Sequence, residues 1–352
     1  MLIYLFCYLI IIVGYFFYKN NLFAKKHYCI FMTLVLTCII GLRNEMMGLV
    51  DTHYVYRFRF EEIVMYGWDY VLYYNKDIGF QTLTFLFTKV FGDNFTLYLL
   101  CMAFPYVASI SYLIYKYSKS PMISFAIFTS LQFFTITFTL MRQVFAMGIL
   151  ILAFKYVIDK KPIKFTLLVL LASIFHQVAI LFLVVYPLVK IKNVYVFLCI
   201  VSAGVISSTL FSSKIMYVIS IIQQTNERYN HVNSNDSTNL TYFFVCLLFL
   251  LISLLYFKTI KKSELNYILF KLSALATTIA PLSTVFREAS RVSYMFSIFN
   301  IILLPNILVL EKDKKTRNLM ATLTIVVFMI YFLFFLGKGT NVIPYRFFWQ
   351  TL

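Results

Sequence analysis

Charged side chains are scarce in this chain of 352 residues: they make up 13% of it, and only 14 residues are acidic. An ordinary soluble domain is about one quarter charged. Hydrophobic residues account for 61% of the sequence and aromatic residues for 19%. No soluble fold can bury that much apolar surface, so the composition predicts an integral membrane protein.

Motifs for disulfides, metals and secretion are also missing. The six cysteines all fall inside apolar runs, without any Cys-x-x-Cys pair, and no His-x-x-x-His or Asp-x-Asp pattern occurs. We therefore expect the cysteines to be packing residues, and we expect no metal site and no cofactor. The N-terminus lacks a basic segment and a small-residue cleavage site before Lys19. This pattern favours a retained first span over a removable signal peptide.

Apolar runs long enough to cross a bilayer recur along the chain, a span needing about 20 residues. We count about ten, at residues 1–18, 27–42, 94–115, 121–139, 142–158, 194–211, 240–258, 265–286, 292–310 and 317–336. Two segments are ambiguous, since 79–91 is short and 163–189 is too long for one span.

The positions of the lysines decide between the alternatives, because basic residues collect on the cytoplasmic side. If 79–91 is an interfacial helix and 163–189 a hairpin, every lysine cluster falls inside and both termini fall outside. Phe80, Leu83, Phe87 and Val90 recur at helical spacing, which is typical of an amphipathic helix at an interface. The hairpin apex would lie near His176, the polar point of its stretch.

The predicted fold is therefore an all-α, polytopic transmembrane bundle of about ten full spans plus a re-entrant hairpin, or 10–12 helices by count. Such a bundle is compatible with a GT-C-like architecture. We treat 1–352 as a single integral membrane domain with a first external loop at 43–78 and a second at 212–239.

The arginines follow a different pattern from the lysines. The formal net charge of +17 would suggest nucleic acid in a soluble protein, but here the lysines report topology, and no nucleic-acid partner is expected. The same threading places all arginines except Arg317 at the outer side: Arg43, Arg57, Arg59, Arg142, Arg228, Arg287, Arg291 and Arg346. Guanidinium groups bind phosphate oxygens bidentately, so we infer an outward-facing site for a phosphorylated, lipid-linked ligand. The alternative is that they pair with Glu61, Glu62, Asp69 or Glu288.

Several residues could carry chemistry at such a site. Asp51 and His176 are the candidate bases, because a carboxylate beside arginines stays ionised and a neutral imidazole accepts a proton near pH 7. A loop salt bridge and a structural histidine are the competing interpretations. Arg142 begins a span, where it could equally extend to lipid headgroups. The other candidates are Arg287 and Arg291, four residues apart on one helical face with Glu288 and Tyr294, and Arg346 in the aromatic tail.

Together these segments resemble the EpsG-like branch of the Wzy-type polysaccharide polymerases. The resemblance is carried, in order, by Gly41-Leu-Arg43 with Asp51 and Tyr54, Asp77-Ile-Gly79-Phe80, Met141-Arg142-Gln143, Ala172 to His176 with Ala179, Arg291 with Tyr294, and Pro344-Tyr345-Arg346-Phe347. One departure is Asp77, which stands where the family usually has Glu before Gly-Phe.

The resemblance implies a metal-independent glycosyltransferase of a bacterial cytoplasmic membrane that polymerises O-antigen, capsule or exopolysaccharide repeat units at the external, periplasmic face. Undecaprenyl-pyrophosphate-linked oligosaccharides would be both donor and acceptor, and a chain-length regulator, a flippase and membrane lipids would be its partners. Arg142, Arg287, Arg291 and Arg346 would bind the pyrophosphate. Acceptor or loop support would come from Arg43, Tyr54, Asp77, Gln143, Glu288, Tyr294 and Tyr345.

Two other functions fit a lipid-linked ligand. A flippase for the same oligosaccharide should show repeat symmetry and charges accessible from both faces, whereas the sequence has no internal repeat and one-sided arginines. A glycan ligase, or an acyltransferase with His176 as its base, is the other alternative. An acyl donor gives less reason for so many outer cations.

Overall fold

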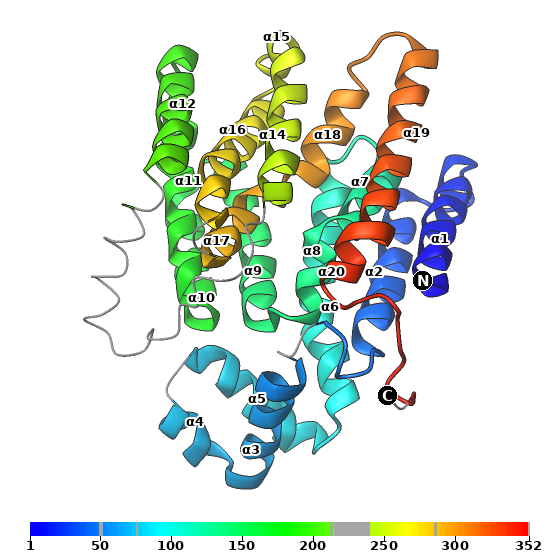
Figure 1. Cartoon of the computed structure of the whole chain (residues 1–352), viewed down its shortest axis with the longest axis vertical. Coiled ribbons are helices and arrows are strands. Elements are labelled where there is room, and N and C mark those ends of the chain that lie inside the picture. The colour runs from blue at the N-terminus through cyan, green and yellow to red at the C-terminus, as the bar shows by residue number, and fades with distance from the viewer. Residues whose placement is uncertain (49–51, 75–76, 212–213, 215–239, 285–286, 351–352) are drawn as a thin grey trace. The chain divides into compact units, whose positions relative to one another are not determined.

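Helices form nearly all of the described chain (Figure 1). The computed structural model describes residues 1–48, 52–74, 77–211, 214, 240–284 and 287–350. Within these ranges there is no β-strand, and extended segments meet only in an isolated antiparallel bridge between Arg43 and Phe347. The all-α prediction is confirmed for this part of the chain, which divides into two compact units, residues 1–180 with 311–352 and residues 181–310.

The prediction of about ten full spans is wrong. By length and composition, the described ranges contain five helices able to cross a membrane, or seven if two bent helix pairs each count as one span. The five are Leu2–Lys19, Phe95–Tyr117, Met141–Ile158, Glu264–Ser283 and Lys314–Gly339. Many of the remaining apolar runs form helices of only 10–17 residues. The chain is therefore a polytopic helical membrane protein, with fewer complete spans among the described residues than the ten predicted.

The run at 121–139 shows how an apolar stretch is broken. Helix α7 (Pro121–Ser130) and the helical segment Gln132–Phe138, which begins with α8 (Gln132–Thr135), meet at a bend of 65°. Leu131 between them has extended backbone, with φ −108° and ψ 173°. Thr129 and Ser130 donate hydroxyl hydrogen bonds to the carbonyl oxygens of Phe125 and Ala126. Such side-chain bonds compete with the helical ladder at the end of a helix.

The first unit is built around α6 (Phe95–Tyr117), which packs against α2 (Lys25–Gly41) and α9 (Met141–Ile158). Small residues permit this close approach. A Cβ on Gly41 would lie 2.7 Å from the Leu100 Cα of α6, and one on Gly148 would lie 3.3 Å from the Tyr106 Cα. Buried hydroxyls of different helices also pair: Thr33 donates to Ser111 over 2.7 Å, since the alternative is an unsatisfied polar group.

The segment predicted as the first external loop contains helices where it is described. A π-helical turn at Thr52–Arg57 leads into α3 (Phe58–Tyr66) and α4 (Trp68–Tyr74). These helices pack on α5 (Ile78–Phe91) through an aromatic cluster that includes Phe60, Phe87, Phe95 and Tyr98. Of the aromatic residues of this segment, Tyr56 and Phe60 belong to this buried cluster, whereas others, such as Tyr73, are exposed.

The helix predicted at 79–91 is present as α5, and its position at the membrane interface remains a prediction. Phe80 and Phe87 are buried within the protein, together with Gln81 and Thr84, whereas Val90 is 72% exposed. The Thr84 hydroxyl forms a 2.9 Å hydrogen bond with the Tyr98 hydroxyl, which explains how a polar side chain is accommodated there.

The stretch 163–189 breaks at the residue predicted as its apex. Helix α10 (Pro162–Phe175) ends before His176, whose backbone is extended, and a 3₁₀ segment begins at Gln177 and runs to Val184. The prediction of a membrane hairpin remains a prediction, but the polar interruption that it required is a real end of a helix.

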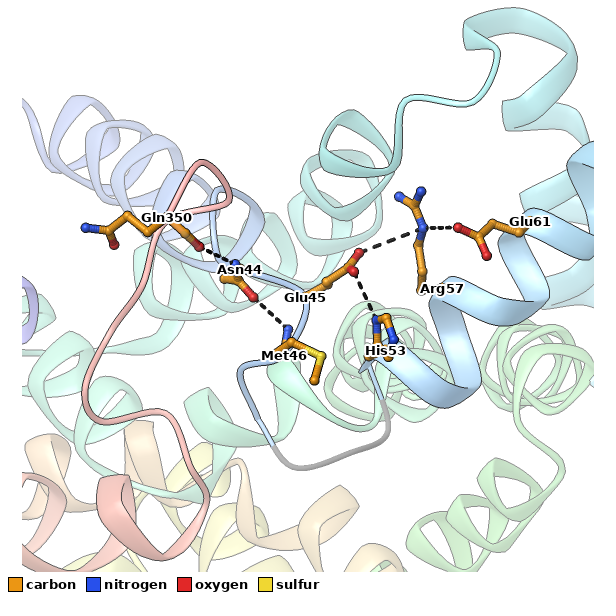
Figure 2. Close-up of polar contacts among 7 residues, drawn as sticks. All are labelled: Asn44, Glu45, Met46, His53, Arg57, Glu61 and Gln350. Carbon is orange, nitrogen blue, oxygen red and sulfur yellow. Dashed lines mark hydrogen bonds and ion pairs between the residues drawn. The ribbon is translucent and has the colours of Figure 1, made fainter. Parts of the chain in front are cut away.

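The C-terminal tail runs back along the end of α2. The backbone N–H of Asn44 donates to the Arg346 carbonyl oxygen over 2.9 Å, and the backbone N–H of Phe348 donates to the Leu42 carbonyl oxygen over 3.0 Å. The Asn44 side chain donates to the Gln350 carbonyl oxygen over 2.8 Å (Figure 2). The tail is thus attached to the start of the segment that follows α2, more than 300 residues earlier in the chain.

The second unit surrounds α16 (Glu264–Ile279), which packs against α12 (Val194–Leu210), α14 (Leu240–Leu255) and α17 (Arg287–Ser297). Lys271 of α16 is 1% exposed. Its ammonium group donates to the carbonyl oxygens of Val189, 2.9 Å away, and Ile191, 2.6 Å away. These carbonyl groups lie at the end of α11 (Val185–Lys190) and just beyond it. The end of a helix leaves its last carbonyl oxygens without amide donors, and the lysine donates to them instead.

Candidate functional site

An ion pair between Arg142 and Asp77 is the centre of the candidate site. Arg142 lies in the first turn of α9, and its Nη1 donates to Oδ2 of Asp77, the residue before α5. The Arg142 side chain is 23% exposed and that of Asp77 12% exposed. Water therefore screens this pair less than it screens a surface salt bridge.

A second guanidinium group, that of Arg59, lies near this pair. The Arg59 Cζ atom is 4.3 Å from the centre of the Tyr74 ring, and Nη1 of Arg59 is buried without a hydrogen-bond partner among the described residues. Burial lowers the pKa of Arg59, and the nearby Arg142 cation lowers it further. Of the two arginines, only Arg142 has a carboxylate partner among the described residues, so two guanidinium groups and one carboxylate leave the cluster with an excess positive charge.

Tyr56 connects these residues to the aromatic core. Its ring centre is 6.0 Å from the Arg142 Cζ atom, and its side chain is only 5% exposed. The same ring meets Phe80 edge to face, with 6.0 Å between centres. Tyr56 belongs to the π-helical turn at Thr52–Arg57, a conformation that occurs frequently at functional sites.

His176 follows the end of α10, and two contacts bring that end to the same corner of the first unit. A Cβ on Gly79 would lie 3.0 Å from the Ile174 carbonyl oxygen, so α5 begins directly against the end of α10. The rings of Phe145 and Phe175 are 4.7 Å apart, which brings the beginning of α9 to the same place. The sequence-predicted residues Asp77, Arg142 and His176 therefore belong to three helix ends that converge.

Gln143 follows Arg142 but faces the helix packing. Its side chain is 2% exposed, and its Nε2 atom lies 3.8 Å from the Met147 sulfur. This placement agrees with a supporting role more than with contact to a ligand.

A second polar group of residues surrounds Arg57 (Figure 2). Nε of Arg57 lies 2.5 Å from a Glu61 carboxylate oxygen and 3.8 Å from Oε2 of Glu45. The other oxygen of Glu45 lies 2.9 Å from Nδ1 of His53. Here one arginine has two carboxylate partners, the reverse of the ratio around Arg142.

Arg43 is almost fully buried, with 1% exposure, and it caps α2. Its Nη1 donates to the Ile40 carbonyl oxygen over 2.5 Å, and its Cζ atom lies 5.0 Å from the centre of the Phe138 ring. Burial lowers its pKa to about 10. Nε and Nη2 are without hydrogen-bond partners in the described part of the chain. Tyr345 packs nearby and donates to the Ile39 carbonyl oxygen over 2.8 Å, so both residues hold the end of α2.

The remaining predicted residues belong to other parts of the chain. Asp51 lies outside the described residues, as do the side chains of Arg287 and Glu288. Arg291 and Tyr294 belong to α17 of the second unit, where the Tyr294 ring meets that of Tyr242 edge to face. Arg346 lies in the tail of the first unit, half buried. Tyr54 is 61% exposed and contacts the His53 ring.

Tyr56, Arg59 and Tyr74 were not predicted as site residues. Arg59 was recognised only as one of the outer arginines, and the two tyrosines resembled the many other aromatic residues. A signal did exist, because Tyr56 and Arg59 are three residues apart and so share a face once the segment is helical.

Comparison with known protein families decides the assignment. The chain matches the model of the EpsG family over residues 26–347, nearly its whole length. The chain belongs to the EpsG family. No curated protein and no solved structure matches it. As an EpsG-family protein it is a membrane protein of a polysaccharide-polymerase-like kind, and the match includes Asp77, Arg142 and His176.

Proposed function

We propose that this EpsG-family protein polymerises undecaprenyl-pyrophosphate-linked oligosaccharide repeat units at the external leaflet of a bacterial cytoplasmic membrane. The observation that carries the proposal is the excess positive charge where the Arg59 cation lies near the ion pair of Arg142 and Asp77. Guanidinium groups bind phosphate oxygens in pairs, and a pyrophosphate would neutralise the charge that Asp77 leaves uncompensated.

The reaction is a glycosyl transfer. The bond between the anomeric carbon of the donor sugar and the pyrophosphate oxygen breaks, and the electron pair leaves with the lipid pyrophosphate. A new bond forms between the same carbon and an acceptor hydroxyl oxygen, whose proton passes to a base. If the attack is direct, the anomeric configuration inverts.

In this proposal the arginines act on the leaving group. Negative charge develops on the pyrophosphate as the bond breaks, and cations held in place beforehand stabilise that charge without reorganisation. Arg142 is held by Asp77, and Arg59 by the Tyr74 ring. Arg291, Arg287 and Arg346 are proposed as further contacts of the lipid-linked substrate. His176 and Asp51 are the proposed bases for the acceptor proton.

Reconstitution tests the proposal. Purified protein in liposomes, supplied with the lipid-linked repeat unit, should produce a ladder of longer lipid-linked glycans. Arg142→Ala and Arg291→Ala proteins that remain folded should not extend the ladder. Unchanged chain growth in both variants would remove these arginines from the mechanism, and movement of the lipid-linked unit across the bilayer without elongation would favour a flippase.

A further inference from the structure

A pocket of about 400 Å³ lies beside the Arg57 network of the first unit. Residues of four segments line it, including Arg43, Asn44, Glu45, Arg57, Phe95 and Phe348. Its size is within the range of small-molecule sites, about 300–1,000 Å³. The pocket therefore has room for a ligand of the size of one or two sugar rings.

The charges of this pocket differ from those of the Arg142 cluster. The Arg57 cation is compensated by Glu61 and Glu45, and Glu45 itself lines the pocket. Arg43 is a second cation of the wall, so the two arginines are balanced by Glu45 and Glu61, and the Glu45 carboxylate in the wall would repel a phosphate group. The chemistry thus disfavours a second pyrophosphate site and favours a ligand that is neutral and rich in hydroxyl groups.

Hydrogen-bonding groups of both kinds surround the pocket. Glu45 offers acceptor oxygens, Arg57 offers donors, and the Thr96 hydroxyl can do either. Each sugar hydroxyl both donates and accepts, so neighbouring hydroxyls are satisfied by such a mixture.

Aromatic side chains complete the pocket. Phe95 is buried in its wall beneath Arg57, whose Cζ atom lies 5.0 Å from the ring centre. Phe348 is 47% exposed and comes from the C-terminal tail. An aromatic face next to planar polar groups suits a sugar ring, which presents C–H groups on one face and hydroxyls at its edge.

Neighbouring residues of one helical turn connect the pocket with the arginine cluster. Tyr56 lies against Arg142, whereas the next residue, Arg57, lines the pocket. A polymerase must bring an acceptor sugar to the carbon that carries the pyrophosphate. We infer that this pocket binds the non-reducing terminal sugar of the acceptor glycan, an inference that rests on the proposed function.

The test uses an oligosaccharide that can act as the glycosyl acceptor but not as the donor. Repeat-unit oligosaccharide released from its lipid by mild acid has no pyrophosphate, so it can be extended by a lipid-linked donor but cannot donate. For Glu45→Gln, Thr96→Val and Phe348→Ala, the KM for this oligosaccharide should rise roughly tenfold, as expected for the loss of one good contact. The KM for the lipid-linked donor should stay as in the wild type.

Tyr195→Ala is the matched control, because Tyr195 is an exposed aromatic residue of α12 and does not line the pocket. Its acceptor KM should remain that of the wild type. An unchanged acceptor KM in all three pocket variants would overturn the inference while leaving the polymerase proposal intact.

A direct binding measurement distinguishes a failure of the polymerase proposal from a failure of the pocket inference. If the wild-type protein elongates no glycan, the polymerase proposal fails. The pocket is then judged by titrating the lipid-free oligosaccharide into purified protein. Binding that Glu45→Gln weakens and Tyr195→Ala does not weaken supports a saccharide pocket, and an oligosaccharide that the wild type does not bind overturns it.

Discussion

Arg142 pairs with Asp77 although the two residues are 65 positions apart in the sequence. Each lies at the beginning of a helix, and each helix contacts the end of α10, the helix that precedes His176. The pair therefore fixes the direction of one guanidinium group where three helix ends meet. An arginine held in this way loses little conformational freedom when it binds an anion.

Exchanging the charges of Asp77 and Arg142 distinguishes a catalytic role of this ion pair from a structural one. Asp77→Arg/Arg142→Asp restores the ion pair with its members exchanged, so the protein should fold and keep its thermal unfolding temperature near that of the wild type. Chain growth should stay reduced by about 10²-fold or more, because the cation no longer faces the leaving group. Chain growth at the wild-type rate would show that the pair is only structural.

Arg59→Gln should reduce chain growth, since it removes the second cation but keeps a polar side chain of similar length. The expected loss is about 10-fold to 10²-fold in kcat/KM for the lipid-linked donor. Lys89→Gln is the matched control, because Lys89 is an exposed cation at the other end of α5. Equal rates in the two variants would contradict a role for Arg59.

The hydrogen bond between Thr84 and Tyr98 should be measurable by a double-mutant cycle. Thr84→Val leaves a buried Tyr98 hydroxyl without its side-chain partner, which should lower the free energy of unfolding by about 1–3 kcal/mol. Adding Tyr98→Phe should recover part of this loss, because both polar groups are then gone. Denaturant titration in detergent provides the measurement, and additive effects would show that the two hydroxyls do not interact.

Lys271→Met tests the lysine that holds the end of α11. Methionine fills similar space but donates no hydrogen bond, so the carbonyl oxygens of Val189 and Ile191 would lose their shared donor. We expect a lower unfolding temperature and faster hydrogen exchange in the segment 185–194, with Lys262→Met as the control at an exposed lysine. Exchange that is equally slow in both variants would contradict this role.

Much of the helical fold could be predicted from the sequence, and the reasons are local. Apolar runs predicted helices, and the polar His176 predicted the end of α10. The number of spans could not be predicted, because the bend at Leu131 follows from backbone geometry inside a run that hydropathy shows as continuous. Glycine and proline, the usual signals of a break, are absent around Leu131.

The candidate site was predictable one residue at a time but not as an arrangement. Arg142 and His176 were identified because a polar residue beside an apolar run needs a reason. The pairing of Arg142 with Asp77 was not identified, since nothing in the local sequence relates Asp77 to a residue 65 positions later. Arg59 required knowledge that the segment after residue 52 is helical, and in the sequence that segment resembles a polar loop.

The attachment of the tail to the end of α2 has a consequence for biosynthesis. Phe348, which lines the pocket, is translated long after Glu45 and Arg57. The early helices can enter the membrane long before the pocket wall is complete. A chain whose synthesis stops before Phe348 would therefore be inserted but would lack one wall of the pocket.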